Sequence, residues 1–122
     1  MKKKIMLIVP TLRQGGLERV CVTTARLLDP LYEVYIVLFN SADIAYDIRG
    51  LSVIDLRMGA VPSKIGKIRN VIRRSRRVAQ LKKELKIDVA YSFGMTANIV
   101  NDLSKGYAKT ITACNSFEEI KD

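Results

Sequence analysis

Short apolar runs alternate with segments of helical periodicity along most of this chain. Five runs have the continuity expected of strands buried on both faces of a sheet, at residues 5–9, 34–39, 51–56, 87–93 and 109–114. Between them, apolar residues that recur every three or four positions predict helices at about 16–28, 64–86 and 96–103. This alternation predicts an α/β fold, a Rossmann-like doubly wound parallel sheet of about five strands flanked by helices.

The ends and faces of the predicted helices follow from the same pattern. Asp29-Pro30 ends the first helix, because a residue before proline avoids the α region. Ser63 is a suitable N-cap for the long second helix. The apolar row expected on the first helix consists of Leu17, Val20, Thr24, Leu27 and Leu28. The apolar face expected on the second consists of Ile65, Ile68, Val71, Ile72, Val78 and Ala79.

The length of 122 residues corresponds to one domain with a sizeable core. The chain ends just past the fifth predicted strand without the helix that should cover it, so residues 1–122 are expected to be a truncated single domain. No apolar stretch reaches the roughly 18 to 20 residues of a membrane span. The amino-terminal run, Ile5 to Val9, is shorter than the roughly 7 to 15 residues of a secretory signal.

Two cysteines and the absence of histidine exclude several kinds of site. Cys/His zinc sites, Ser-His or Cys-His nucleophile pairs and histidine proton shuttles all need an imidazole. Cys21 and Cys114 are expected to be free, buried thiols in a reducing compartment. No Asp-x-Asp pair is present either, so the metal-carboxylate clamp that such a pair forms is missing and we expect no metal ion; no cofactor is expected either.

The whole net charge of +9 lies in one segment. Residues 64–86 hold ten lysines and arginines against one acid, Glu84, and the remainder of the chain is neutral. Helical spacing puts Arg69, Arg73 and Arg77 opposite the apolar face, with Arg76 at its margin. Arg69, Arg73 and Arg77 repel one another at i,i+4 spacing, which suggests an anionic partner for this arginine face of the helix.

Three interpretations of the basic segment remain open. It is a membrane-contact surface, a solvated helix face, or a nucleic-acid interface. An anionic bilayer gains roughly 1 kcal/mol for each nearby Lys or Arg. Nucleic acid is the least favoured partner, because no aromatic residue lies between Lys64 and Lys86 to stack on bases.

The stretch PTLRQGGLERV places two glycines where the first strand ends and the first helix begins. The unpaired amides at such a helix start, with the helix dipole, favour an anion. Gly15 and Gly16 would let a phosphate approach the backbone, and Arg13 could add a charged hydrogen bond. A simple tight turn is the alternative. The dinucleotide fingerprint and the Walker loop are both absent.

This stretch, following a strand and opening a helix, resembles the start of bacterial glycosyltransferases of family 4, which have the GT-B fold. DVAYSFGMTAN is similar to the fourth strand and loop of that family, and KTITACNSFEE to its fifth strand. The resemblance covers essentially the whole chain. It implies that the chain is the amino-terminal, acceptor-side domain, and that the carboxyl-terminal domain with the paired glutamates that hold the donor is absent from it.

The resemblance also implies an activity. Such enzymes move sugar from a nucleotide-sugar donor with retention of configuration and without a metal, here to a lipid-linked or polysaccharide acceptor. It places Gly15 and Gly16 near the donor phosphates. Many relatives carry histidine or arginine after the fifth strand, where this chain has Cys114 or Asn115, so the catalytic residue stays unassigned.

Four polar residues are candidates for binding acceptor hydroxyls: Glu18, Ser92, Asn98 and Asn115. Helix or loop capping is the alternative for each. Ligands of open α/β sheets bind at the carboxyl ends of the strands, and this rule nominates the loops after residues 9, 39, 93 and 114. The expected protein is cytoplasmic and peripheral at the inner face of the plasma membrane, and inactive as this fragment alone. The rival hypothesis is a non-enzymatic α/β module that binds anionic membrane or nucleic acid.

Overall fold

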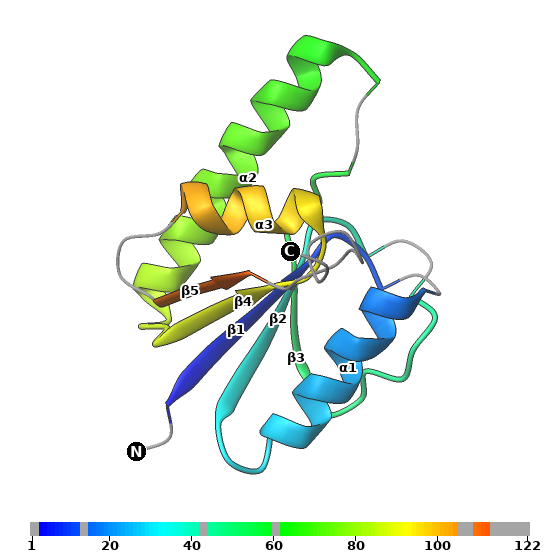
Figure 1. Cartoon of the computed structure of the whole chain (residues 1–122), viewed down its shortest axis with the longest axis vertical. Coiled ribbons are helices and arrows are strands. Elements are labelled where there is room, and N and C mark those ends of the chain that lie inside the picture. The colour runs from blue at the N-terminus through cyan, green and yellow to red at the C-terminus, as the bar shows by residue number, and fades with distance from the viewer. Residues whose placement is uncertain (1–2, 13–14, 42–43, 60–61, 105–108, 113–122) are drawn as a thin grey trace, which may run out of the picture.

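The computed structural model describes residues 3–12, 15–41, 44–59, 62–104 and 109–112. Their elements, in chain order, are β1 (Lys4–Val9), α1 (Gly16–Leu28), β2 (Glu33–Leu38), β3 (Ser52–Asp55), α2 (Lys64–Glu84), β4 (Val89–Ser92), α3 (Met95–Leu103) and β5 (Lys109–Thr112). The strands form one parallel sheet in the order β3-β2-β1-β4-β5. The predicted Rossmann-like α/β class is confirmed, and each predicted strand and helix is present with ends shifted by at most a few residues (Figure 1).

The central strand β1 sorts its side chains to two hydrophobic clusters, as the alternation of a strand requires. Met6 and Ile8 belong to the cluster that includes Val78 and Leu81 of α2 and Val100 of α3. Leu7 and Val9 belong to the cluster on the opposite face, which is built around Cys21, Val22 and Ala25 of α1. The core is therefore two layers of apolar side chains, with β1 between them.

The buried face of α1 differs from the predicted row. Val20 and Leu27 are exposed, whereas Cys21, Val22 and Ala25 are buried against the sheet. Small side chains at these three positions let the helix backbone approach the strands closely, and the larger Leu28 packs against the same cluster while only partly buried. The free, buried thiol predicted for Cys21 is confirmed, and burial raises its pKa to about 12. Cys114 lies outside the described residues.

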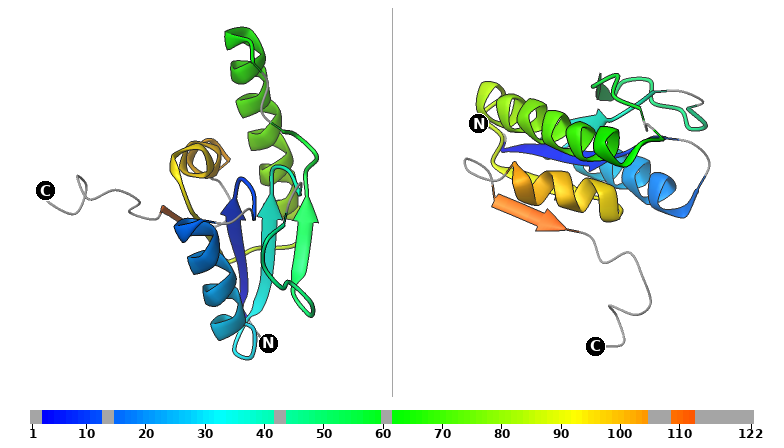
Figure 2. Two further views of the ribbon diagram at one scale, coloured as in Figure 1. Left: turned by 90° about the vertical axis from the view of Figure 1, so that its right-hand side faces the viewer. Right: turned by 90° about the horizontal axis from the view of Figure 1, so that it is seen from above.

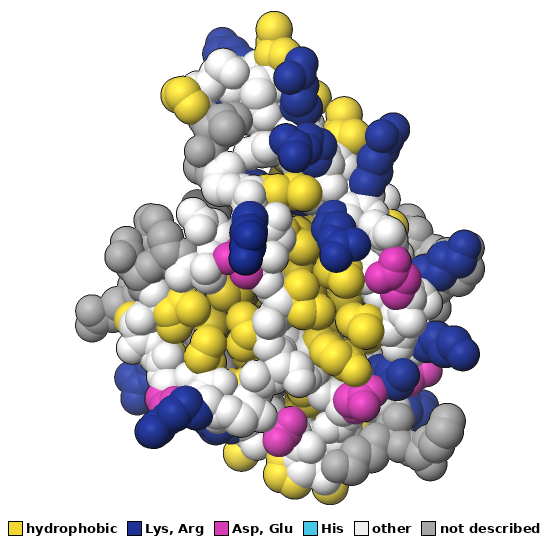
Figure 3. Space-filling view, turned by 180° about the vertical axis from the view of Figure 1, so that it is seen from behind, with side chains coloured by type: hydrophobic (Ala, Val, Ile, Leu, Met, Phe, Trp, Pro, Cys, Tyr) yellow, Lys and Arg dark blue, Asp and Glu magenta, His cyan; other side chains and the backbone are white. Residues whose placement is uncertain are grey.

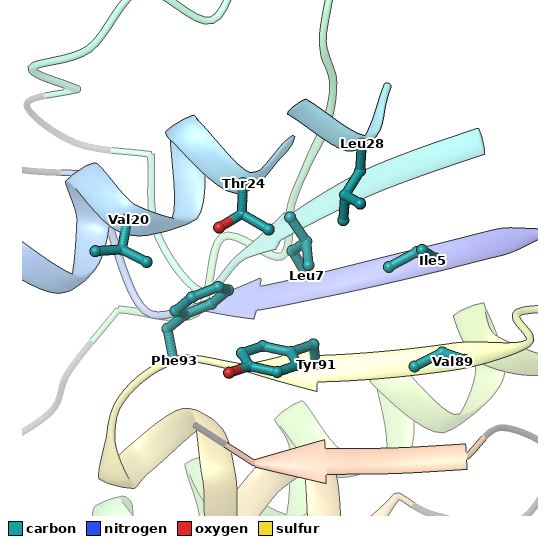
Figure 4. A pocket seen from close by; sticks show the side chains of 8 residues that line it. All are labelled: Ile5, Leu7, Val20, Thr24, Leu28, Val89, Tyr91 and Phe93. Atoms are coloured by element: carbon teal, nitrogen blue, oxygen red, sulfur yellow. The ribbon is translucent and has the colours of Figure 1, made fainter. Parts of the chain in front are cut away.

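Beside α1, the same face of the sheet forms an apolar groove of about 350 Å³. Figure 4 shows Val20, Thr24 and Leu28 of α1 along one side and the strand residues along the other. Tyr91 and Phe93 also line the groove, with their ring centroids 5.0 Å apart. Of the predicted row of α1, Val20 and Thr24 border this groove, and Leu28 borders it and also packs, partly buried, against the core.

The amino-terminal half of α2 extends past the carboxyl ends of the strands, away from the sheet (Figures 1 and 2). The helix begins as predicted, because the Ser63 hydroxyl accepts a hydrogen bond from the Gly66 amide at 2.9 Å. Its predicted apolar face is wrong in large part, since Ile65, Ile68 and Ile72 are 74%, 64% and 48% exposed. The buried residues of α2 are Asn70, Arg74, Ser75, Val78, Leu81 and Lys82.

Candidate functional site at the carboxyl edge of the sheet

A small cavity lies where the strand order reverses, between the loops that follow β1 and β4. Its volume is about 190 Å³. The segments after β1, β2 and β3, the buried side of α2 and the first turn of α3 all contribute to it. Its lining residues are Pro10, Thr11, Phe39, Asn40, Gly59, Arg74 and Thr96. Open α/β sheets bind ligands at this position. The loops after residues 9, 39 and 93, which the sequence nominates for ligand binding, converge there.

The glycine turn before α1 is already partly occupied by the protein. The Gly15 amide donates to the Tyr46 hydroxyl at 3.0 Å, and that hydroxyl donates to the Gly15 carbonyl at 2.8 Å. Tyr46 therefore holds the turn closed from the loop after β2. The Gly15 amide is not available to an anion in this arrangement. The open side of the turn is at Gly16, where an added Cβ would meet nothing within 4 Å.

Glu18 gives the same turn a negative charge. A Cβ built on Gly15 would lie 2.5 Å from a carboxylate oxygen of Glu18, so this side chain folds back over the turn. A carboxylate in the first turn of a helix is stabilised by the dipole, and it repels a second anion. The position favours capping or binding of an uncharged hydroxyl. Arg13, the third predicted phosphate ligand, lies outside the described residues.

Ser92 and Asn98 come together at the junction of β4 and α3. The Ser92 hydroxyl donates to the Asn98 side-chain oxygen at 2.7 Å and accepts from the Asn101 amide group at 3.1 Å. Ser92 and Asn101 are fully buried. These hydrogen bonds join α3 to β4, which is a structural role for the two side chains of the kind that the capping alternative describes. Asn115 lies outside the described residues.

Lys82 is a buried cation that the sequence did not single out. Its ammonium group contacts the Asn101 side-chain oxygen at 2.8 Å and the Ser104 hydroxyl at 3.0 Å, with the carbonyls of the same two residues at 3.4 Å. These acceptors end α3, where the negative end of the helix dipole favours a cation. Burial lowers the pKa of Lys82 to about 8, against an opposing effect of the Asp102 carboxylate.

Arg74 is the second buried cation of α2, and it lines the cavity. It is 7% exposed. Its Nε and Nη2 donate to the Met58 carbonyl at 3.1 and 2.6 Å, and its guanidinium carbon lies 4.4 Å from the centroid of the Phe39 ring. In the described part of the chain no carboxylate pairs with Arg74. Burial lowers the pKa of its guanidinium, which nevertheless stays charged in proteins.

Sequence reasoning missed these two cations for an identifiable reason. Arg74 and Lys82 are eight residues apart with Val78 midway, so all three lie on one side of α2. The sequence contains that spacing. It does not stand out, because both residues belong to a basic segment in which the isoleucines are the most hydrophobic residues and are therefore predicted to face the core.

The solvent side of α2 joins apolar and basic residues. Ile65, Ile68 and Ile72 are exposed, and the predicted membrane-contact residues Arg69, Arg73 and Arg76 are exposed beside them. Arg77 is half-buried and donates to the Gln80 side chain at 2.9 Å. Figure 3 shows basic and hydrophobic side chains interleaved over the protruding end of the molecule. We name this end, residues 64–77, the α2 arm.

Within the described residues, no group of three or more cysteine, aspartate or glutamate side chains could hold a metal ion. No helix in that part of the chain is both long and apolar enough to cross a bilayer. No protein-family model matches this sequence, and a search of curated proteins finds no match either.

Proposed function

We propose that this protein is the acceptor-side domain of a retaining glycosyltransferase that works at an anionic membrane surface. It would help move sugar from a nucleotide-sugar donor to a lipid-linked or polysaccharide acceptor. The similarity of PTLRQGGLERV and the two later segments to family 4 glycosyltransferases motivates the activity. The parallel sheet with a cavity at its switch point is compatible with it.

The observation that carries the membrane part of the proposal is the exposed isoleucine row on the α2 arm. Three exposed isoleucines among arginines gain nothing from contact with water alone. In a helix that lies in a bilayer interface, the isoleucines insert among the acyl chains and the arginines contact the anionic headgroups. Each arginine near an anionic surface contributes about 1 kcal/mol. Each isoleucine that leaves water adds on the order of 1 kcal/mol or more.

The direction of the arm connects the surface to the cavity. The arm extends from the same edge of the sheet at which the loops after β1, β2 and β3 line the cavity (Figure 2). A bilayer touched by the arm would therefore lie on the cavity's side of the molecule. An acceptor whose lipid tail is in that bilayer could present its polar end there.

Vesicle co-sedimentation tests the membrane part, using two triple variants. Ile65→Ser with Ile68→Ser and Ile72→Ser removes the apolar row, and Arg69→Gln with Arg73→Gln and Arg76→Gln removes the charge. Both should lose about tenfold or more of the affinity for phosphatidylglycerol vesicles. The arginine variant should also lose most of the salt dependence.

The same variants separate membrane from nucleic acid, which belongs to the rival non-enzymatic module. Nucleic-acid binding depends on the arginines and is indifferent to the isoleucines. If the isoleucine variant sedimented with anionic vesicles as well as the unmodified protein does, or if duplex DNA bound more tightly than the vesicles, the membrane proposal would fail.

The transferase part needs its own experiment. The longest product of the gene should incorporate label from one of a panel of nucleotide sugars into a lipid or polysaccharide fraction. The resemblance implies that the donor is held mainly by a second domain, so the 122-residue chain alone should give little or no transfer. Absence of label with every donor, from a product that still binds vesicles, would leave only the non-enzymatic module.

A further inference from the structure

The cavity at the carboxyl edge contains a charge, on Arg74, that the described residues leave partly unsatisfied. A guanidinium has five N–H donors, of which the Arg74 contacts with the Met58 carbonyl use two. The other three have no acceptor among the described residues. Taking a charge out of water is costly unless it is paired and hydrogen-bonded, and the Phe39 ring offsets only part of that cost.

The first turn of α3 brings further donors to the cavity. Gly94 precedes it with a φ of 95°, a conformation that suits glycine, and the first helical hydrogen bond runs from the Asn98 amide to the Gly94 carbonyl. The amides of residues 95–97 therefore have no acceptor inside the helix. Thr96, in this turn, lines the cavity, and the turn contains no acidic residue.

The size and lining of the cavity restrict the ligand. About 190 Å³ is less than the roughly 300 Å³ or more of pockets for drug-sized ligands. The space suits one small group and not a whole nucleotide. Its polar side chains include Thr11, Asn40 and Thr96 as well as Arg74, and none of the described residues that line it is acidic.

We propose that this cavity is a binding site for a single phosphate group, held by the Arg74 guanidinium and the first-turn amides of α3. A phosphate supplies the acceptors that both donors lack, and arginine binds phosphate through parallel N–H bonds. The cavity has this chemistry whether or not the protein transfers sugars. It is also distinct from the glycine turn of α1, where Tyr46 occupies an amide and Glu18 contributes a negative charge.

Nitrogen–proton NMR of the 122-residue protein, titrated with inorganic phosphate at constant ionic strength, locates the site directly. The expected result is saturable shifts of the amides of Thr11, Asn40, Gly59 and Thr96 and of the Arg74 Nε–H. Shifts confined to residues 16–18 or to the exposed arginines of the α2 arm would overturn the proposal.

Three variants test which groups bind. Arg74→Lys should lower phosphate affinity by about tenfold, because a lysine cannot make the parallel bonds. Arg49→Lys, at an exposed arginine that pairs with Asp47 and does not line the cavity, is the matched control and should change affinity by less than about twofold. Thr96→Val should weaken binding by roughly threefold without touching Arg74. Unchanged phosphate affinity in a folded Arg74→Lys protein would overturn the assignment. If that variant does not fold, the assignment would be overturned by unchanged affinity in Thr96→Val together with no phosphate-induced shifts around Arg74.

Two probes identify the source of the phosphate group. Glycerol 3-phosphate represents a phosphate carried on a lipid or sugar, and inorganic phosphate represents the free anion. The same amides should respond to both. Tighter binding of glycerol 3-phosphate assigns the site to a carried phosphate, tighter binding of inorganic phosphate assigns it to the free anion, and a response to neither would overturn the proposal.

Discussion

The two buried cations of α2, Arg74 and Lys82, have similar burial and opposite surroundings. Lys82 is enclosed by four oxygen acceptors at the end of α3. Arg74 contacts one carbonyl and the face of a ring, and three of its N–H groups have no acceptor among the described residues. A buried charge with all its donors used is a structural part of the core, whereas one with donors to spare points to a ligand. Counting acceptors therefore separates a scaffold residue from a candidate binding residue.

Lys82→Met should give the largest loss of stability. It leaves the buried oxygens of Asn101 and Ser104 without their donor, and an unsatisfied buried acceptor of this kind costs about 1 to 3 kcal/mol. Chemical denaturation measures the free energy of unfolding. The neighbouring exposed Lys83→Met is the control, with an expected change within about 0.5 kcal/mol. A loss no larger than in the control would show that α3 does not depend on Lys82.

The pH dependence of stability should carry the signature of Lys82. Its pKa in the folded protein, about 8, is below the ordinary value of 10.5, so between these values the unfolded chain binds a proton that the folded protein has lost. Stability attributable to Lys82 should therefore rise with pH across that window, by at most about 3 kcal/mol. The raised pKa of Cys21 acts in the opposite direction, with stability lost between pH 9 and about 12.

The difference between the unmodified protein and Lys82→Met isolates the lysine contribution, because Cys21 is common to both. That difference should grow from about pH 8 upward. A constant difference from pH 7 to pH 10 would mean that Lys82 titrates normally, and the contrast between the two cations would weaken.

Arg74→Met should behave differently from Lys82→Met. Replacing a buried charge by an apolar side chain of similar length is often nearly neutral, so stability without phosphate should change by about 1 kcal/mol or less. Phosphate at ten times its dissociation constant should stabilise the unmodified protein by about 1.4 kcal/mol and Arg74→Met hardly at all. Equal phosphate stabilisation in both proteins would contradict the role given to Arg74.

The smallest effect is expected at the glycine turn of α1. Glu18→Gln removes the carboxylate over Gly15 and should cost about 0.5 kcal/mol through the helix dipole. Phosphate affinity for the cavity should stay the same, measured by the shifts of the Thr96 amide. A tenfold gain in total phosphate affinity, with new shifts at Gly16, would make the glycine turn the main anion site.

The fold could be predicted from sequence because its signals are local. Continuous apolar runs gave the strands, and Ser63 and Asp29-Pro30 gave helix ends that the structure confirms. The helix faces were predicted less well. In α1 the small residues Cys21 and Ala25 pack and the larger Leu27 does not, and in α2 the isoleucines are exposed while Arg74 is buried.

The sequence predicts where the candidate site lies in the fold, but not which residues form it. The switch-point rule located the loops that converge on the cavity. Arg74 of α2, Phe39 after β2 and Met58 after β3 come together only in the tertiary structure, so no local sequence pattern predicts this contact. The occupation of the Gly15 amide by Tyr46, 31 residues away, is equally invisible in the motif.

A crystal structure of the protein grown with phosphate tests the central claim most directly. The anion should lie in the cavity within hydrogen-bond distance of the Arg74 guanidinium and of at least one first-turn amide of α3. If a carboxylate of the protein itself paired with Arg74, or if the cavity held only water at saturating phosphate, Arg74 would be a second structural cation and not a binding residue.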